Sequence, residues 1–198
     1  MNSRRASSSL ESLAWPASRI GEALEGLARH SGLSSRTAPA PCPPGDLSTE
    51  EIDDWINAAA EQLGVETQSV EVAYPDLDPF VREAAPVLMK VPSAEAPAQF
   101  LALVRGGKRN VILLAPDLSL VSVAAEAVRD TLCGTMEAPH LTETDRILTE
   151  AGVNGSQRTH ARRAILREQL GGERIGDCWL VRATPSTDMR MQARQLGL

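Results

Sequence analysis

The sequence has few aromatic residues and few cysteines, and each shortage excludes a class of structure. Aromatic residues make up 3% of the 198 positions, so the hydrophobic 42% consists chiefly of aliphatic side chains. The three cysteines, Cys42, Cys133 and Cys178, lie far apart and form no CxxC pair, which argues against a disulfide framework and a zinc site. We therefore expect an aliphatic core and reduced thiols, as in a cytoplasmic protein.

Long apolar runs and familiar catalytic motifs are missing as well. No stretch approaches the ~18–20 apolar residues that cross a bilayer, and the N-terminus lacks the apolar core of a secretory signal. There is no P-loop, GxGxxG, GxSxG or HExxH motif, so we expect no cofactor. His30, His140 and His160 share no metal-binding spacing, so we expect no metal ion.

Charge is distributed unevenly along the chain. Residues 157–198 contain eight Arg and four acidic residues, a balance of +4, whereas the whole chain carries −6, so the first 156 residues carry −10. An acidic body argues against nucleic-acid binding, and we expect no nucleic-acid partner. The Arg-rich tail leaves alternatives open: contact with a membrane surface, with a partner or, against the overall charge, with RNA, or an ordinary solvated helix face.

The first third of the chain carries helical patterns separated by a proline-rich connector. Ile20, Leu24 and Leu27 recur at i, i+4 and i+7, which predicts a helix that ends at Gly32. Residues 34–46 contain too many prolines for regular structure. The capping box from Ser48 to Glu51 predicts a second helix.

Strand patterns follow, and the clearest is a hairpin. The stretch AQFLALVRGGKRNVILLAPD places two apolar runs on either side of a polar turn with two glycines. Strands are predicted at 69–74, 86–92 and 118–123 around this hairpin, with helices at 76–84 and 124–132. Helices first and a largely antiparallel sheet afterwards indicate the α+β class.

The character of the sequence changes after Gly134. Two helical stretches, TETDRILTEAG and SQRTHARRAILREQLGG, are followed by a short apolar piece, CWLVR, and by a terminal helix. We therefore predict a disordered N-terminus at 1–14, an α+β domain at 15–134, and an Arg-rich, mainly helical extension at 135–198.

The order and spacing of elements in residues 15–133 resemble a known family, the papain-like peptidase domains at the N-terminus of bacteriocin-type ABC exporters. Members of that family cleave double-glycine leader peptides from the exported cargo. The segments that carry the resemblance are SRIGEALEGLARHSG, INAAAEQLGVE, SVEVAY, PVLMKVP and QFLALVRGGKRNVILLAP. The resemblance implies a papain-like α+β fold with N-terminal helices and a mostly antiparallel sheet.

Carried over residue by residue, the resemblance implies that the catalytic side chains are replaced. The place of the nucleophilic Cys falls at about Arg19, that of the His on Gln99 and that of the Asp on Ala115, which precedes a retained Pro116. Gln does not take a proton from a thiol at neutral pH, and Ala cannot orient a base. On this alignment the domain is not an enzyme.

The resemblance then implies a non-catalytic domain that binds cargo or leader peptide, or regulates the transporter, on the cytoplasmic side of the membrane. Its partners would include the transmembrane and nucleotide-binding domains of an exporter, whether the chain is a fragment of one or a separate relative. We expect peptide contacts from Arg19, Gln99, Phe100 and Trp55, although Trp55 fits an ordinary core residue equally well.

Two other readings stay open at this point. One is an unrelated soluble adaptor or scaffold whose helical tail contacts a partner. The other is a thiol hydrolase that uses Cys42 with a displaced base, although the prolines around Cys42 supply neither a base nor a helix N-terminus.

Overall fold

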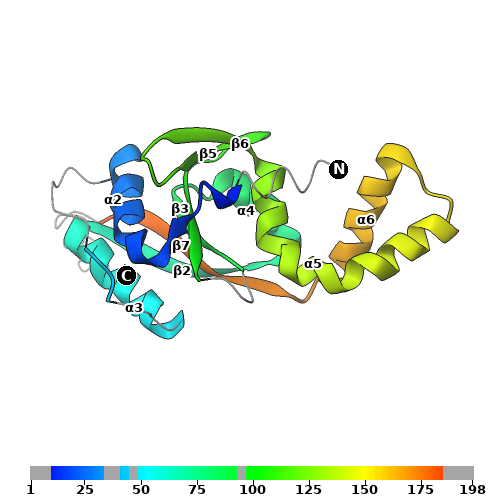
Figure 1. Ribbon diagram of the computed structural model, residues 1–198, viewed down its shortest axis with the longest axis horizontal. Coiled ribbons are helices and arrows are strands. Elements are labelled where there is room, and N and C mark those ends of the chain that lie inside the picture. Colours follow the sequence, from blue (N-terminus) through cyan, green and yellow to red (C-terminus); the bar gives the residue numbers. More distant parts are fainter. Residues whose placement is uncertain (1–9, 34–40, 45–48, 93–96, 185–198) are drawn as a thin grey trace, which may run out of the picture.

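The computed structural model describes residues 10–33, 41–44, 49–92 and 97–184. Some sequence-based predictions fall wholly or largely on other residues: disorder at 1–9, the irregular connector at 34–46, the cap at Ser48, and the terminal helix after 185. Within the described ranges the class is α+β, as predicted, with a seven-stranded antiparallel sheet and five α-helices (Figure 1).

The sheet has the strand order β2-β7-β3-β4-β5-β6, and β1 pairs with β4 beside the end of β5. All strand pairs are antiparallel. The strands are β1 (Trp15–Pro16), β2 (Val65–Ala73), β3 (Val87–Val91), β4 (Gln99–Arg105), β5 (Asn110–Leu114), β6 (Leu120–Ala124) and β7 (Arg174–Ala183).

Helices cover both faces of the sheet, and each face has its own core. The bounds are α2 (Ile20–His30), α3 (Thr49–Leu63), α4 (Leu77–Glu83), α5 (Ala125–Glu150) and α6 (Gly155–Gln169), with 3-10 turns η1 (Ala17–Arg19) and η2 (Tyr74–Asp76). Successive side chains of β3 point to opposite faces of the sheet and so belong to different cores. Val87 and Met89 pack with α4 and α5, while Leu88 packs with α2 and α3.

The sequence prediction treated residues 135–198 as a separate extension, and the structure differs from it. β7 lies between β2 and β3, so a strand from the expected extension is a central strand of the sheet. The sequence showed only the apolar piece CWLVR because Gly176 and Asp177 interrupt the strand pattern. The described chain therefore forms one sheet with a core on each face, rather than a body with a separate helical tail.

The expected boundary near residue 134 lies inside α5. Gly134 and Pro139 suggested a linker, because both residues disfavour helix interiors. The structure instead carries one helix from Ala125 to Glu150, with Pro139 and His140 inside it. Figure 1 shows that α5 bends along its length, which is what an interior proline produces when it does not end a helix.

Residues 10–14, which the sequence prediction placed in a disordered N-terminus, are part of the fold. Leu10 and Ala14 are buried and belong to the core between the sheet and α5. The sequence did not indicate this contact, because two apolar residues among polar neighbours show no periodicity.

A buried group of polar side chains attaches α5 to the rest of the protein. Arg129 donates one hydrogen bond to the Tyr74 hydroxyl at 2.6 Å and contacts the Glu137 carboxylate at 2.5 Å, while Tyr74 donates to Glu137 at 2.6 Å. The Arg129 and Glu137 side chains are only 7% and 13% exposed. Burial, together with the bond to Glu137, raises the pKa of Tyr74 far above its usual range.

No helix in the described part of the chain is both long enough and apolar enough to cross a membrane.

One glycine substitution tests the continuity of α5, and a second one, directly after β4, provides a destabilising contrast. Gly134→Ala is expected to raise the free energy of unfolding by ~0.5–1 kcal/mol, because its Cβ meets no atom within 4 Å and alanine favours a helix. Gly106→Ala is expected to lower it by about 2–3 kcal/mol, because a Cβ there would lie 2.0 Å from the Arg82 carbonyl oxygen. Urea unfolding measures both, and no gain for Gly134→Ala would mean that residue 134 lies outside a helix.

A second pair of variants tests the attachment of α5. Glu137→Gln is expected to lower the free energy of unfolding by about 2–3 kcal/mol, because it leaves the buried Arg129 guanidinium without its main counter-charge. Glu143→Gln removes an ion pair to Arg146 in which both side chains are more than half exposed, and is expected to change stability by less than ~0.5 kcal/mol. Thermal and urea unfolding measure the stability of both variants. An equal loss of stability in the two variants would contradict the assignment of Glu137 to a buried network.

Candidate functional site

The start of α2 is fixed against the sheet by the short strand β1. β1 pairs with the beginning of β4, so Trp15 lies opposite Phe100 and Pro16 lies opposite Gln99. Trp15 is fully buried, and its indole Nε1 donates a 2.7 Å hydrogen bond to the Leu114 carbonyl at the end of β5. One buried side chain therefore joins the helix start to two adjacent strands.

Arg19 links the start of α2 to the turn that follows β5. Its guanidinium donates two hydrogen bonds to the Glu22 carboxylate, at 2.8 and 2.6 Å, and a third of 3.0 Å to the Pro116 carbonyl. The guanidinium carbon also lies 5.1 Å from the centre of the Trp15 ring, within cation–π distance. The bond from Arg19 lowers the pKa of Glu22. We name Trp15, Arg19, Glu22, Gln99 and Pro116 the α2–β4 junction.

The three positions that the family resemblance assigns to catalysis all lie around this junction. Arg19 is the last residue of η1, directly before α2, and Gln99 is the first residue of β4, opposite Pro16. Ala115 is buried and follows β5, next to the Pro116 carbonyl that Arg19 contacts. None of these side chains supplies a thiol, a base or an orienting carboxylate, so they offer charge and hydrogen bonds rather than covalent chemistry.

The structure does not bring all four predicted binding residues to the surface. Phe100 is fully buried, and its ring centre lies 6.1 Å from that of Trp179, so Phe100 is a core residue with no surface for a peptide. Trp55, on α3, is partly buried and packs against the same core. Arg19 and Gln99 remain as partly exposed members of the predicted set.

The connector after α2 crosses the helix start at a glycine. A Cβ on Gly21 would lie 1.8 Å from the Pro41 carbonyl oxygen and 3.3 Å from the Trp55 ring, so only a residue without a side chain fits there. The connector therefore covers this side of the helix start. The Arg19 and Glu22 side chains, which are 39% and 45% exposed, remain accessible beside it.

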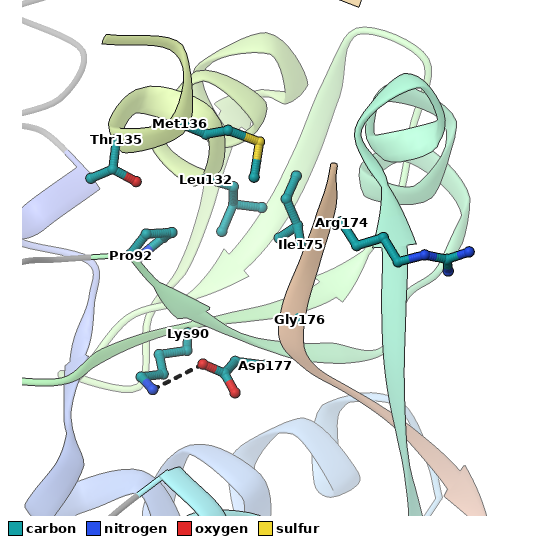
Figure 2. Close-up of a pocket in the computed structure, with 9 residues that line it drawn as sticks. All are labelled: Lys90, Pro92, Leu132, Thr135, Met136, Arg174, Ile175, Gly176 and Asp177. Atoms are coloured by element: carbon teal, nitrogen blue, oxygen red, sulfur yellow. Dashed lines mark hydrogen bonds and ion pairs between the residues drawn. The ribbon is translucent and has the colours of Figure 1, made fainter. Parts of the chain in front are cut away.

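A pocket of about 450 Å³ lies between α5 and the neighbouring ends of β3 and β7 (Figure 2). One side is apolar, and the opposite side carries an ion pair of 2.9 Å between Lys90 Nζ and Asp177 Oδ2, drawn as a dashed line in Figure 2. This β3–β7 pocket is lined by Lys90, Pro92, Leu132, Thr135, Met136, Arg174, Ile175, Gly176 and Asp177.

An irregularity in β7 shapes this pocket. The pairing of β2 with β7 shifts between Val70 and Val72, and Gly176 and Asp177 are the residues of β7 that fall in the shift. Asp177 has a φ of 54°, a left-handed conformation that costs roughly 1 kcal/mol or more for a residue other than glycine. Such strain often accompanies a binding site. The Gly-Asp pair inside an apolar run was the sequence signal for this bulge.

The β3–β7 pocket and the α2–β4 junction lie on opposite sides of the start of β4. Val91 pairs with Gln99 on the side away from Pro16, and Lys90 pairs with Phe100.

Few side chains in the described ranges are suited to thiol chemistry or to metal binding. Cys133 and Cys178 are buried, and burial raises the pKa of each thiol to about 12. Cys42 is exposed, and its Sγ lies 3.8 Å from the Pro43 carbonyl oxygen. Within the ranges that the structure describes, no three His, Cys, Asp or Glu side chains gather in a way that could hold a metal ion.

Comparison with known proteins assigns no family, because no protein-family model and no curated protein matches the chain.

Thiol labelling tests the description of the three cysteines. At neutral pH one thiol per chain, Cys42, is expected to react with iodoacetamide, at about the rate of free cysteine. Cys133 and Cys178 are expected to react only after denaturation, because burial keeps them protonated and covered. Peptide mapping by mass spectrometry identifies the labelled residue. A Cys42 rate far above that of free cysteine would instead support a thiol hydrolase.

Proposed function

We propose that this chain is a non-catalytic peptide-binding domain of, or related to, a bacteriocin-type ABC exporter, and that it holds a cargo or leader peptide or regulates the transporter. The observation that carries the proposal is the docking of β1 on β4, which sets the start of α2 beside Gln99. Arg19 extends this contact to Pro116, directly after Ala115. The family resemblance assigns the three catalytic positions to the same places: a helix start, a strand start and the end of the neighbouring strand.

The side chains at this place are suited to binding rather than to cleavage. Arg19 and Glu22 present a cation and an anion with spare hydrogen-bonding capacity, and Gln99 carries both a donor and an acceptor. These are the groups that hold the polar backbone of a peptide. The β3–β7 pocket, one strand away, has room for an apolar side chain beside a charged pair.

The Arg-rich region gives little support to contact with a membrane surface. Three of its eight arginines are already paired with carboxylates of the chain, which offsets part of their charge, and a fourth donates to a backbone carbonyl. These contacts are Arg158 and Arg162 with Asp145, Arg163 with Glu126, and Arg167 with the Pro75 carbonyl. The peptide site therefore stands at the centre of the proposal, and membrane contact stays a prediction.

A second candidate function is an adaptor whose helical arm contacts a partner. α6 and the distal half of α5 project away from the sheet (Figure 1), and Ile147 on α5 is one of the few large apolar side chains that are exposed. Truncation after residue 134 cannot separate the two candidates, because it also removes β7 from the sheet. Point variants are needed instead.

The test mixes the full chain with fluorescein-labelled leader peptides of the double-glycine type. We expect saturable binding by fluorescence anisotropy and intact peptides by mass spectrometry, since the positions aligned with the nucleophile and base carry Arg19 and Gln99. Cleavage of a leader would contradict the non-catalytic assignment. Failure to bind any leader would contradict the proposed function as a whole.

Two arginine variants locate the binding. Arg19→Ala is expected to weaken leader binding about tenfold, the effect of losing one charge-assisted hydrogen-bonding group. Arg146→Ala is the matched control, because Arg146 makes the same kind of i,i+3 ion pair, with Glu143, on the helical arm. Loss of binding in Arg146→Ala but not in Arg19→Ala would favour the adaptor.

A further inference from the structure

The two edge strands of the sheet are protected very differently. β2 carries Glu66 and Glu71, and charged side chains on an edge strand hinder pairing with another strand. β6 has the sequence LVSVA, without a charged residue, and all five of its residues pair with β5 in one unbroken register. β6 is therefore the edge that is open to an added strand.

Hydrogen bonds at both ends of the β5–β6 ladder fix which backbone groups of β6 face outward. Ala115 N donates to Ser119 O, and Ala125 N donates to Arg109 O, both at 2.9 Å. Bonded pairs alternate along an antiparallel ladder, so the odd-numbered residues of β6 direct their N–H and C=O groups toward β5. The groups that point away from β5 belong to Leu120, Ser122 and Ala124.

Apolar side chains stand at the beginning of this edge. Leu118 and Leu120 are 49% and 48% exposed, and they are two of the three exposed large apolar residues in the described ranges. Leu118 has a φ of 66°, a left-handed conformation unusual for leucine, in a turn where the Asp117 carboxylate accepts hydrogen bonds from Ser119 N and Oγ. This turn therefore holds an apolar side chain out into solvent.

The same turn belongs to the α2–β4 junction. Its Pro116 carbonyl accepts the hydrogen bond from Arg19, so the edge of β6 begins where the proposed peptide site lies. We propose that the bound peptide is extended and adds to the sheet as a strand beside β6, with uncharged, apolar residues over Leu118 and Leu120. This inference rests on the proposed function and specifies how that function's peptide is held.

A peptide fits this edge better than a second copy of the chain. β6 has five residues, a length of ~17 Å, and a single strand pair of that length buries far less than the ~1,200 Å² of a stable protein interface. A short peptide needs no such area, because its backbone hydrogen bonds and a few apolar contacts suffice for moderate affinity.

Two serine-to-proline variants test the edge. Ser122→Pro removes one outward N–H of β6 and leaves the ladder with β5 intact, so leader binding is expected to fall about tenfold. Ser69→Pro makes the same change on the edge of β2. Val181 N donates to Pro86 O, which turns the backbone of Trp179 toward β3, so Ser69 opposite it directs its N–H outward. Ser69→Pro is expected to bind leaders like the wild type.

Amide exchange on the wild-type chain gives an answer that does not depend on how a variant folds. With the labelled leader at saturation, NMR-detected exchange of the Leu120, Ser122 and Ala124 amides is expected to slow at least tenfold. The Val121 and Val123 amides, which already bond to β5, are expected to change little. The exposed amide of Ser69 on β2 serves as the internal control.

The outcomes separate this inference from the proposed function. In one outcome the wild type binds leaders, Ser122→Pro binds them with the same affinity, and the β6 amides exchange at the same rate. That result would overturn the assignment of the peptide to the β6 edge and would leave the proposed function in place. Absence of leader binding would overturn both. A third outcome is that, without peptide, the protection of the β6 amides rises with protein concentration and light scattering shows a dimer. A second copy of the chain would then occupy the edge, and this would also overturn the inference.

Discussion

The fold depends on a strand that the chain adds last. β7 lies between β2 and β3, and it is the strand through which β2 is joined to the rest of the sheet. Trp179 on β7 packs against Phe100 and donates its indole N–H to the Asp53 carboxylate on α3, so the same strand ties the helices of one face to the sheet. The Trp179–Asp53 contact and the pairing of β2 with β7 join residues more than 100 positions apart. Their closure must wait until nearly the whole described chain is present.

The features proposed for binding follow from how this sheet is completed. β1 takes the place beside β4 that β5 leaves free, because β5 ends at Leu114, and Trp15 then bonds to the Leu114 carbonyl. On the other side of β4 the bulge in β7 directs Asp177 toward Lys90. Both features occupy the end of the sheet where regular pairing stops. Backbone groups are least satisfied by neighbouring strands at such an end, and polar side chains are therefore most useful there.

Local signals in the sequence were enough for the helices α2 and α3, for β3 and for the β4–β5 hairpin, since each has a clear apolar period or turn. They were not enough for β7, whose Gly176 and Asp177 break the alternation, or for α5, in which Gly134 and Pro139 read as a linker. The family resemblance led us to expect that Arg19 and Gln99 belong to one region. It could not reveal that Phe100 is in the core, because the neighbour that covers it, Trp179, comes from a strand that was not recognised.

The open edge of β6 is the feature that a purely structural role explains least well. The Ser122 side chain is exposed, so a lysine there would block edge pairing without disturbing the core. β2 carries this kind of protection, and β6 does not. An unprotected edge exposes the protein to unwanted pairing, and the strained turn at Leu118 adds a local energetic cost beside it. Both costs become intelligible if the edge must remain available to a strand from another molecule. The hydrogen bond from Arg19 to the Pro116 carbonyl puts that edge next to the α2–β4 junction, where we propose that the peptide is held.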